Sequence, residues 1–351
     1  MADLVALLAG PGLVAAGIKV VILIGLVLTA VAYISFAERR IAGFIQERIG
    51  PNRVGPMGLL QPVADGLKFI FKEEVIPAKA HRLTFILAPV ISVTMALATY
   101  AVLPLGGPFE AFGTTIVPQV ANLDIGILYI FAVASLGVYG VVLAGWSSNS
   151  KYALMGGLRS AAQLVSYELA MTLSGVGVLM AAGSLRLTDI VNAQMHSVWY
   201  VVAMPLGFFI FLVSAFAETN RLPFDLPEAE AEIVAGYHTE YSAMKFAMFY
   251  LAEYIHVTLS SALISILFLG GWHLPFVEGF LERLPDVQRA AAHAAIFAGK
   301  VMCLIFLYMW VRWTLPRFRY DQLMRLGWKV LLPLALVNIL YVGTAVLLGL
   351  F

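Results

Sequence analysis

Long apolar runs dominate this sequence and decide what it can fold into. A helix needs about 20 apolar residues to cross roughly 30 Å of hydrocarbon, and runs of that kind recur along the whole chain. Hydrophobic residues make up 61% of the 351 residues, and charged residues only 12%. A soluble domain carries about twice that charged fraction. The chain is therefore predicted to be an integral membrane protein.

The apolar runs are predicted to be helices. Lipid cannot satisfy free backbone N–H and C=O groups, and the runs do not alternate in polarity as barrel strands would. The fold class expected is an all-α integral membrane protein, a single polytopic domain over residues 1–351, without internal repeats. The eight predicted spans cover residues 13–36, 83–104, 126–146, 161–182, 198–217, 246–271, 294–315 and 330–350.

The distribution of cations predicts the orientation of the chain. Eight spans place both termini on one side and the connections 37–82, 147–160, 218–245 and 316–329 on the other. With their flanks, these connections hold 17 of the 22 Lys and Arg residues. The other five are Lys19, Arg186, Arg283, Arg289 and Lys300. An excess of Lys and Arg marks the cytoplasmic side, so both termini are expected on the outer side.

Composition also excludes several kinds of site. The low charge gives no electrostatic basis for binding nucleic acid. The single cysteine, Cys303, can form neither an internal disulfide nor an iron–sulfur site. No cluster of His, Cys and acidic residues repeats at metal-ligand spacing, so no metal site is expected.

The cytoplasmic loop at residues 37–82 is predicted to contain an amphipathic helix near residues 58–72. Gly50-Pro51 and Gly55-Pro56 exclude one continuous helix across its middle. An apolar stripe then follows at helical spacing, formed by Leu59, Leu60, Val63, Leu67, Ile70 and Phe71, and the opposite face carries Gln61, Asp65, Lys68 and Lys72. Such a helix lies in the membrane interface. It is either an ordinary anchor or a side wall at the mouth of a tunnel for a lipophilic substrate.

Four arginines crowd the start of the same loop. They are Arg39, Arg40, Arg48 and Arg53, and Glu38 and Glu47 lie among them. One interpretation is that each simply anchors the cytoplasmic side. The other is that ion pairs with the two glutamates hold a surface for another subunit, a role that suits the planar guanidinium group.

Two acidic residues are predicted to lie inside membrane spans. Glu168 lies about seven residues inside the fourth predicted span, and Glu253 lies near the start of the sixth. An acid at membrane depth is costly unless it is paired, hydrated or protonated, and such residues are usually functional. The alternatives are a structural hydrogen bond for Glu168 and a position at the interface for Glu253. His256 shares a helical face with Glu253 because the two are three residues apart.

The acidic cytoplasmic loop at residues 217–245 is the most unusual connection. Its stretch at residues 217–241 carries one cation, Arg221, and six carboxylates, which are Glu218, Asp225, Glu228, Glu230, Glu232 and Glu240. Acidic runs are usually solvated. Here Pro, Phe, Leu, Ile and Val are interleaved with the acids, and membrane spans flank the segment. Crowding should raise the pKa values of these carboxylates and make them titrate as a coupled set.

Two stretches carry a resemblance to a known family. They are ERRIAGFIQERIGPNRVGPMGLLQPVADGLKFIFKEE, residues 38–74, and AETNRLPFDLPEAEAEIVAGYHTEYSAMKFAMFYLAEY, residues 217–254. With the length and the eight spans, they resemble the membrane subunit of respiratory complex I (NADH:quinone oxidoreductase) that adjoins the quinone site. This is the family of the bacterial H subunit and of mitochondrial ND1. The resemblance extends over nearly the whole chain.

The resemblance implies a role within a larger enzyme. The chain would be a non-redox subunit that anchors the peripheral arm, forms much of the quinone chamber and tunnel, and couples quinone reduction to proton pumping. The first and sixth spans and the helix at 58–72 would border the tunnel mouth. Coupling would involve Glu168, Glu218, Asp225, Glu228, Glu230, Glu232 and Glu253. The chamber or the docking surface would involve Arg39, Arg40, Arg48, Arg53, Gln61, Asp65, Lys68 and Arg221.

The resemblance also implies the setting of the protein. Quinone would be the substrate, and this chain would carry no covalently bound cofactor. Iron–sulfur clusters and FMN would lie in partner subunits. The partners would be the peripheral-arm subunits at the quinone site and the other membrane-arm subunits, with quinone and lipid. The protein would lie in the cell inner membrane with both termini on the periplasmic side.

Two other functions are compatible with parts of the sequence. A related subunit of a membrane-bound hydrogenase would share the family features but would have no quinone. A stand-alone transporter could use Glu168 for proton coupling, but it would be expected to show the repeats that this sequence lacks.

Overall fold

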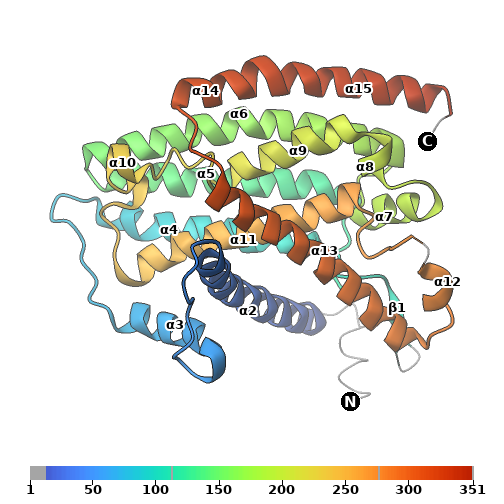
Figure 1. The fold of residues 1–351 in the computed structure, drawn as a ribbon, viewed down its shortest axis with the longest axis horizontal. Helices are drawn as coiled ribbons and strands as arrows, with labels where there is room; N and C mark the ends of the chain where they lie inside the picture. The colour runs from blue at the N-terminus through green and yellow to red at the C-terminus, as the bar shows by residue number, and fades with distance from the viewer. Residues whose placement is uncertain (1–12, 112–113, 276, 350–351) are drawn as a thin grey trace.

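The computed structural model describes residues 13–111, 114–275 and 277–349. Within these residues, seven helices are long and apolar enough to cross a membrane. Helices α4, α5, α6 and α11 lie side by side with the C-terminal helix, and α2 and α13 lie on one flank of this bundle (Figure 1). The long helices are α2 (Leu13–Ile45), α4 (Arg82–Ala98, extended by η2, Thr99–Val102), α5 (Gly126–Ser147), α6 (Lys151–Ala182), α11 (Ala243–Phe268), α13 (Asp286–Thr314) and the continuous run α14 (Tyr320–Arg325), η4 (Leu326–Leu331) and α15 (Leu332–Leu347). The all-α membrane fold is therefore confirmed.

The remaining predicted span, at residues 198–217, is a shorter and interrupted helix. It consists of α8 (Tyr200–Ala203) and α9 (Pro205–Glu218), which are separated at Met204. Proline has no backbone N–H, so Pro205 begins a new helix and does not continue α8. The 14 residues of α9 rise about 21 Å at 1.5 Å per residue, which is less than the hydrocarbon thickness.

Small residues let the central helices approach closely. A Cβ on Gly140 of α5 would lie 2.1 Å from Ser92 Oγ of α4. A Cβ on Gly156 of α6 would lie 2.5 Å from the backbone nitrogen of Tyr237, in the acidic loop. Larger side chains would separate these elements, as in other membrane helix contacts built on small residues. The loop is thus held directly against α6.

The predicted interfacial helix is present as α3 (Gln61–Phe71), preceded by the short 3₁₀ turn η1 (Pro56–Gly58). Gly55 and Gly58 have φ values of 72° and 82°, the left-handed region that favours glycine. The apolar stripe is exposed, with Val63 at 57% and Phe71 at 83%. Helix α3 lies beside α2, outside the main bundle (Figure 1). An exposed apolar face of this kind fits the membrane interface.

Shorter elements gather at the two ends of the bundle. At one end lie α10 (Glu230–Ile233) and η3 (Gly236–His238), both in the acidic loop. At the other end lie α7 (Leu187–His196), α12 (Glu278–Leu281) and a two-stranded hairpin of β1 (Phe109–Ala111) and β2 (Thr114–Ile116), which the sequence did not predict. The C-terminal end of α15 lies at this second end, opposite α10 (Figure 1).

Candidate functional site

Buried charges meet where α2, α11, α13 and the acidic loop converge. We call Glu38, Arg221, Glu253, Arg312 and Tyr254 the charged cluster. Arg221 Nη1 donates to both carboxylate oxygens of Glu38, at 3.0 Å each. Arg221 Nε also forms an ion pair with Glu253, and Arg312 forms one with Glu38. Glu38 and Arg221 are 6% and 5% exposed, so these ion pairs are largely shielded from water.

Arg221 is the centre of the charged cluster. Burial opposes its charged form, but Glu253 and Glu38 outweigh burial and hold the pKa of Arg221 above its usual value. Its guanidinium carbon lies 4.3 Å from the ring centroid of Tyr254, and the Tyr254 hydroxyl donates to Glu38 at 2.8 Å. Two cations thus balance two carboxylates.

The acids of the loop occupy different environments. Asp225 accepts from Arg317 at 2.8 Å. Glu232 pairs with Arg159 at 2.6 Å, and its side chain is 48% exposed. Glu228 is largely buried, and burial together with Glu253 and Asp225 raises its pKa well above the usual value for Glu. The backbone of Glu230 begins α10, but its side chain lies outside the described residues.

His238 in η3 is the nearest basic group to Glu228. Its Nδ1 lies 3.7 Å from Glu228 Oε1. Burial lowers the pKa of His238 to about 4, so the imidazole is neutral at neutral pH. Glu228 and His238 therefore form a buried pair in which the ordinary charged states of both groups are disfavoured.

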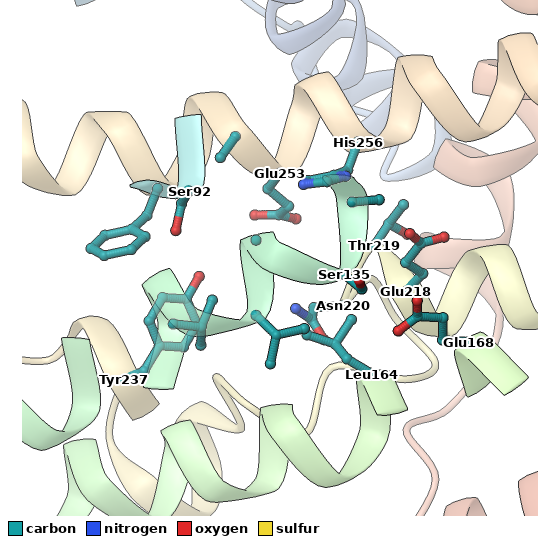
Figure 2. Close-up of a pocket in the computed structure, with 16 residues that line it drawn as sticks. Ser92, Ser135, Leu164, Glu168, Glu218, Thr219, Asn220, Tyr237, Glu253 and His256 are labelled. Carbon is teal, nitrogen blue, oxygen red and sulfur yellow. The ribbon is translucent and has the colours of Figure 1, made fainter. Parts of the chain in front are cut away.

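A second group of acids lines a small cavity, which we call the polar cavity. About 60 Å³ is open to the centres of water molecules, enough for several waters. Glu168 from α6 and Glu218 from α9 lie together at one end, and Glu253 and His256 line the wall formed by α11 (Figure 2). Glu253 therefore borders the polar cavity and also belongs to the charged cluster.

A much larger cavity lies on the other side of the charged cluster, between α2, α11 and α13. We call it the apolar slot. Its volume is about 630 Å³, and its walls are almost entirely hydrophobic. Ile34, Ile305 and Met309 line this slot and also a water-sized space beside Glu38, Arg221 and Arg312. The apolar slot therefore leads to the charged cluster.

The positively charged loop forms a separate surface near α3. Arg39 pairs with Asp65 at 2.7 Å, and Gln61 donates to the same carboxylate at 3.0 Å. Arg48 donates to Gln46 at 2.7 Å, and the Arg40 guanidinium lies 5.6 Å from the ring of Phe36. Arg53 and Lys68 are exposed.

The structure joins some predicted site residues and separates others. Glu168, Glu218 and Glu253 meet at the polar cavity, and Arg221 joins Glu253 in the charged cluster. The predicted pairing of Glu38 with its neighbouring arginines is wrong, because Glu38 faces Arg221 and Arg312, whereas Arg39 turns to α3.

Several residues in and around the charged cluster are missing from the predicted site set. They are Glu38, Tyr254, Arg312, Arg317 and His238. Arg312 lies in the last turn of a span, which is an ordinary position for an anchoring cation. Its pairing with Glu38 joins positions 274 residues apart, so no local pattern could identify it. Among the described residues, no group of three or more His, Cys, Asp or Glu is placed to hold a metal ion.

Comparison with known proteins identifies the family. A family model described as NADH dehydrogenase matches residues 18–343. An NADH-quinone oxidoreductase H subunit from Cytophaga hutchinsonii is 51% identical over 90% of this chain and 92% of its own. The H subunit from Geobacter metallireducens is 51% identical over 94% of this chain and 96% of its own length. The H subunit from Leptospira biflexa is 50% identical over 93% of each chain. Identity at this level over nearly the whole length shows that the chain belongs to the family of the H subunits of NADH-quinone oxidoreductase.

Proposed function

We propose that this chain is the subunit of a proton-translocating NADH:quinone oxidoreductase that forms part of the quinone chamber and tunnel entrance, anchors the peripheral arm and couples quinone reduction to proton pumping. It acts within the complex and carries no redox centre of its own. Electrons arrive from FMN and iron–sulfur clusters held by partner subunits. The names and the coverage of the relatives support the assignment to this complex.

The apolar slot leading to the charged cluster is the observation that carries the proposed quinone path. A membrane quinone has a hydrophobic tail and a polar head. About 630 Å³ of apolar space between α2, α11 and α13 has the size and polarity to hold the hydrophobic tail. The charged cluster beyond Ile34 and Met309 offers hydrogen-bonding groups to the polar head of the quinone. The first and sixth predicted spans, α2 and α11, are two of the three walls.

The acidic groups supply the coupling. Quinone reduction adds two electrons and consumes two protons. When these protons are drawn from groups near the quinone, those groups become more negative, so the charge beside the loop changes. Unscreened charges interact strongly at low dielectric, and Glu228 is largely buried, with burial, Glu253 and Asp225 all raising its pKa. Its protonation therefore responds to the charge of its neighbours. Glu253 transmits the change from the charged cluster to Glu218 and Glu168 across the polar cavity. From there it passes to neighbouring membrane-arm subunits.

The surface beside α3 is the proposed docking site for the peripheral arm. Arg48, Arg53 and Lys68 lie exposed there, next to the Arg39–Asp65 pair. Arginine suits planar contacts with carboxylates of a partner. The cation distribution favours a cytoplasmic position for this surface and a periplasmic position for both termini at the inner membrane.

Blocking the apolar slot tests the quinone path. Ala30 of α2 lines the slot, and an Ala30→Trp variant fills part of it. On the same helix, Val21 is 71% exposed and does not line the slot, so Val21→Trp is the matched control. In the assembled complex, Ala30→Trp should raise the KM for a long-tailed quinone several-fold and leave that for a tail-less quinone nearly unchanged. Equal kinetics for both variants and both quinones would remove the slot from the quinone path.

A further inference from the structure

His256 of α11 lines the polar cavity with part of its polar surface unused. Its Nδ1 is buried and has no hydrogen-bond partner among the described residues. On the other side of the ring, α5 approaches at Gly137, where a Cβ would lie 3.7 Å from His256 Nε2. A histidine inside a helix bundle usually satisfies its ring nitrogens with neighbouring polar groups. This ring instead borders a space large enough for water molecules.

The other titratable groups that line the polar cavity are all acids. The titratable groups that line the polar cavity with His256 are Glu253 of α11, Glu218 of α9, Glu168 of α6 and Tyr237 of η3. No lysine or arginine is among the described residues that line this cavity. Carboxylates from three helices therefore face one imidazole, and a proton on that imidazole would be stabilised by the charge on any of them.

His256 lies between two groups of carboxylates that line the cavity. Glu253 lies on one side of the ring, and Glu218 and Glu168 lie together on the other side (Figure 2). Glu253 also pairs with Arg221 of the charged cluster. His256 follows Glu253 by three residues, so both side chains project from the same face of α11. A neutral imidazole accepts a proton at one nitrogen and donates one from the other. The ring thus has the chemistry and the position to join the two ends.

We propose that His256 is a relay residue, which accepts a proton from water beside Glu253 and releases one toward Glu218. One N–H bond forms as the other breaks, and the ring then returns to its first tautomer. This inference rests on the proposed coupling role and adds to it a residue that separates two groups of carboxylates. Water in the polar cavity completes the path on both sides.

Substitution of His256 in the assembled complex gives the first test. His256→Gln keeps a polar side chain of similar reach but cannot carry a proton. It should slow quinone-linked proton translocation by about 10²-fold, the usual size of a general acid–base contribution, and flatten its dependence on pH between 5 and 8. NADH oxidation with ferricyanide should be unchanged, which reports normal assembly. His273→Gln, on a buried histidine outside the cavity, is the matched control and should leave translocation unchanged.

A second variant leaves the imidazole in place. Gly137→Ala puts a methyl group at ordinary contact distance from Nε2, so the helix contact is preserved while water is displaced. This variant should also slow translocation, by a smaller factor than His256→Gln. Wild-type translocation rates and pH profiles in both variants would overturn the proposal.

Infrared spectroscopy detects a change in the protonation or tautomer of the imidazole, which a residue with only a structural role would not show. Redox-induced difference spectra of complex with ¹⁵N-labelled histidine should contain an imidazole band on quinone reduction, and His256→Gln should lack it. Spectra without such a band in the wild type would also overturn the proposal.

The Glu168→Gln variant separates the role of His256 from the proposed coupling path. If Glu168→Gln abolishes translocation while His256→Gln does not, only the role of His256 is wrong. Normal translocation in both variants would contradict the coupling path itself.

Discussion

Arg221 contacts two carboxylates and one aromatic ring at once in the charged cluster. Breaking a buried ion pair by removing one partner costs about 3–5 kcal/mol, since the other charge remains buried. We expect Arg221→Met to strip the subunit from the purified complex or to lower the midpoint of its thermal inactivation sharply. Both quantities can be measured on the same membrane preparation.

The matched control for Arg221 is Arg159. It pairs with Glu232, whose side chain is 48% exposed, and exposed pairs contribute less than about 1 kcal/mol. Arg159→Met should therefore assemble normally. Equal losses in the two variants would contradict the special role of the buried pair.

His238 makes the stability of the folded acidic loop depend on pH. Its folded pKa is about 4, below the 6.5 of an unperturbed histidine, so the unfolded segment binds a proton between these values and the folded one does not. Stability therefore falls as pH is lowered from 6.5 to 4, by about 3 kcal/mol in total. Hydrogen exchange of the amides at 236–242, corrected for its intrinsic pH dependence, should show increased opening in this window.

Substitution isolates the histidine from the neighbouring acids. His238→Gln cannot titrate, so the opening of the same amides should vary much less between pH 6.5 and 4. His81→Gln, at an exposed histidine, should behave as the wild type. An unchanged profile in His238→Gln would assign the pH dependence to the acids instead.

At the level of elements, α3 carries the clearest prediction. Its apolar stripe is exposed, and its opposite face carries Lys68. If the stripe lies in the acyl boundary, the fluorescence of Val63→Trp should be quenched by brominated lipids, and that of Lys68→Trp should be quenched much less. Comparable quenching at both positions would mean that α3 does not rest on lipid through this stripe.

The elements also show what sequence reasoning can and cannot reach. Hydrophobic runs and the stripe from Leu59 to Phe71 have local periods, so the spans and α3 could be predicted. The interruption at Met204 is preceded and followed by apolar residues, so the run at 198–217 looked continuous. Glu38 lies beside Arg39 and Arg40 in sequence, but its partners Arg221 and Arg312 lie 183 and 274 residues away. Helix packing alone determines such pairs.

At the level of the whole molecule, the two ends of the bundle should face different compartments. Asn52, in the loop before α3, and Gly279, in α12, are exposed at opposite ends. With Cys303 replaced by Ser, Asn52→Cys should react with an impermeant maleimide only from the cytoplasm, and Gly279→Cys only from the periplasm. Labelling of the two positions from the same side would contradict the predicted topology.

The shared position of Glu253 has a consequence for how far a signal must travel. This one carboxylate pairs with Arg221 of the charged cluster and also lines the polar cavity. In the mechanism proposed here, a change of charge in the cluster reaches the cavity through that group. Transduction over this step then requires neither domain rotation nor a long lever, only the redistribution of hydrogen nuclei and solvent.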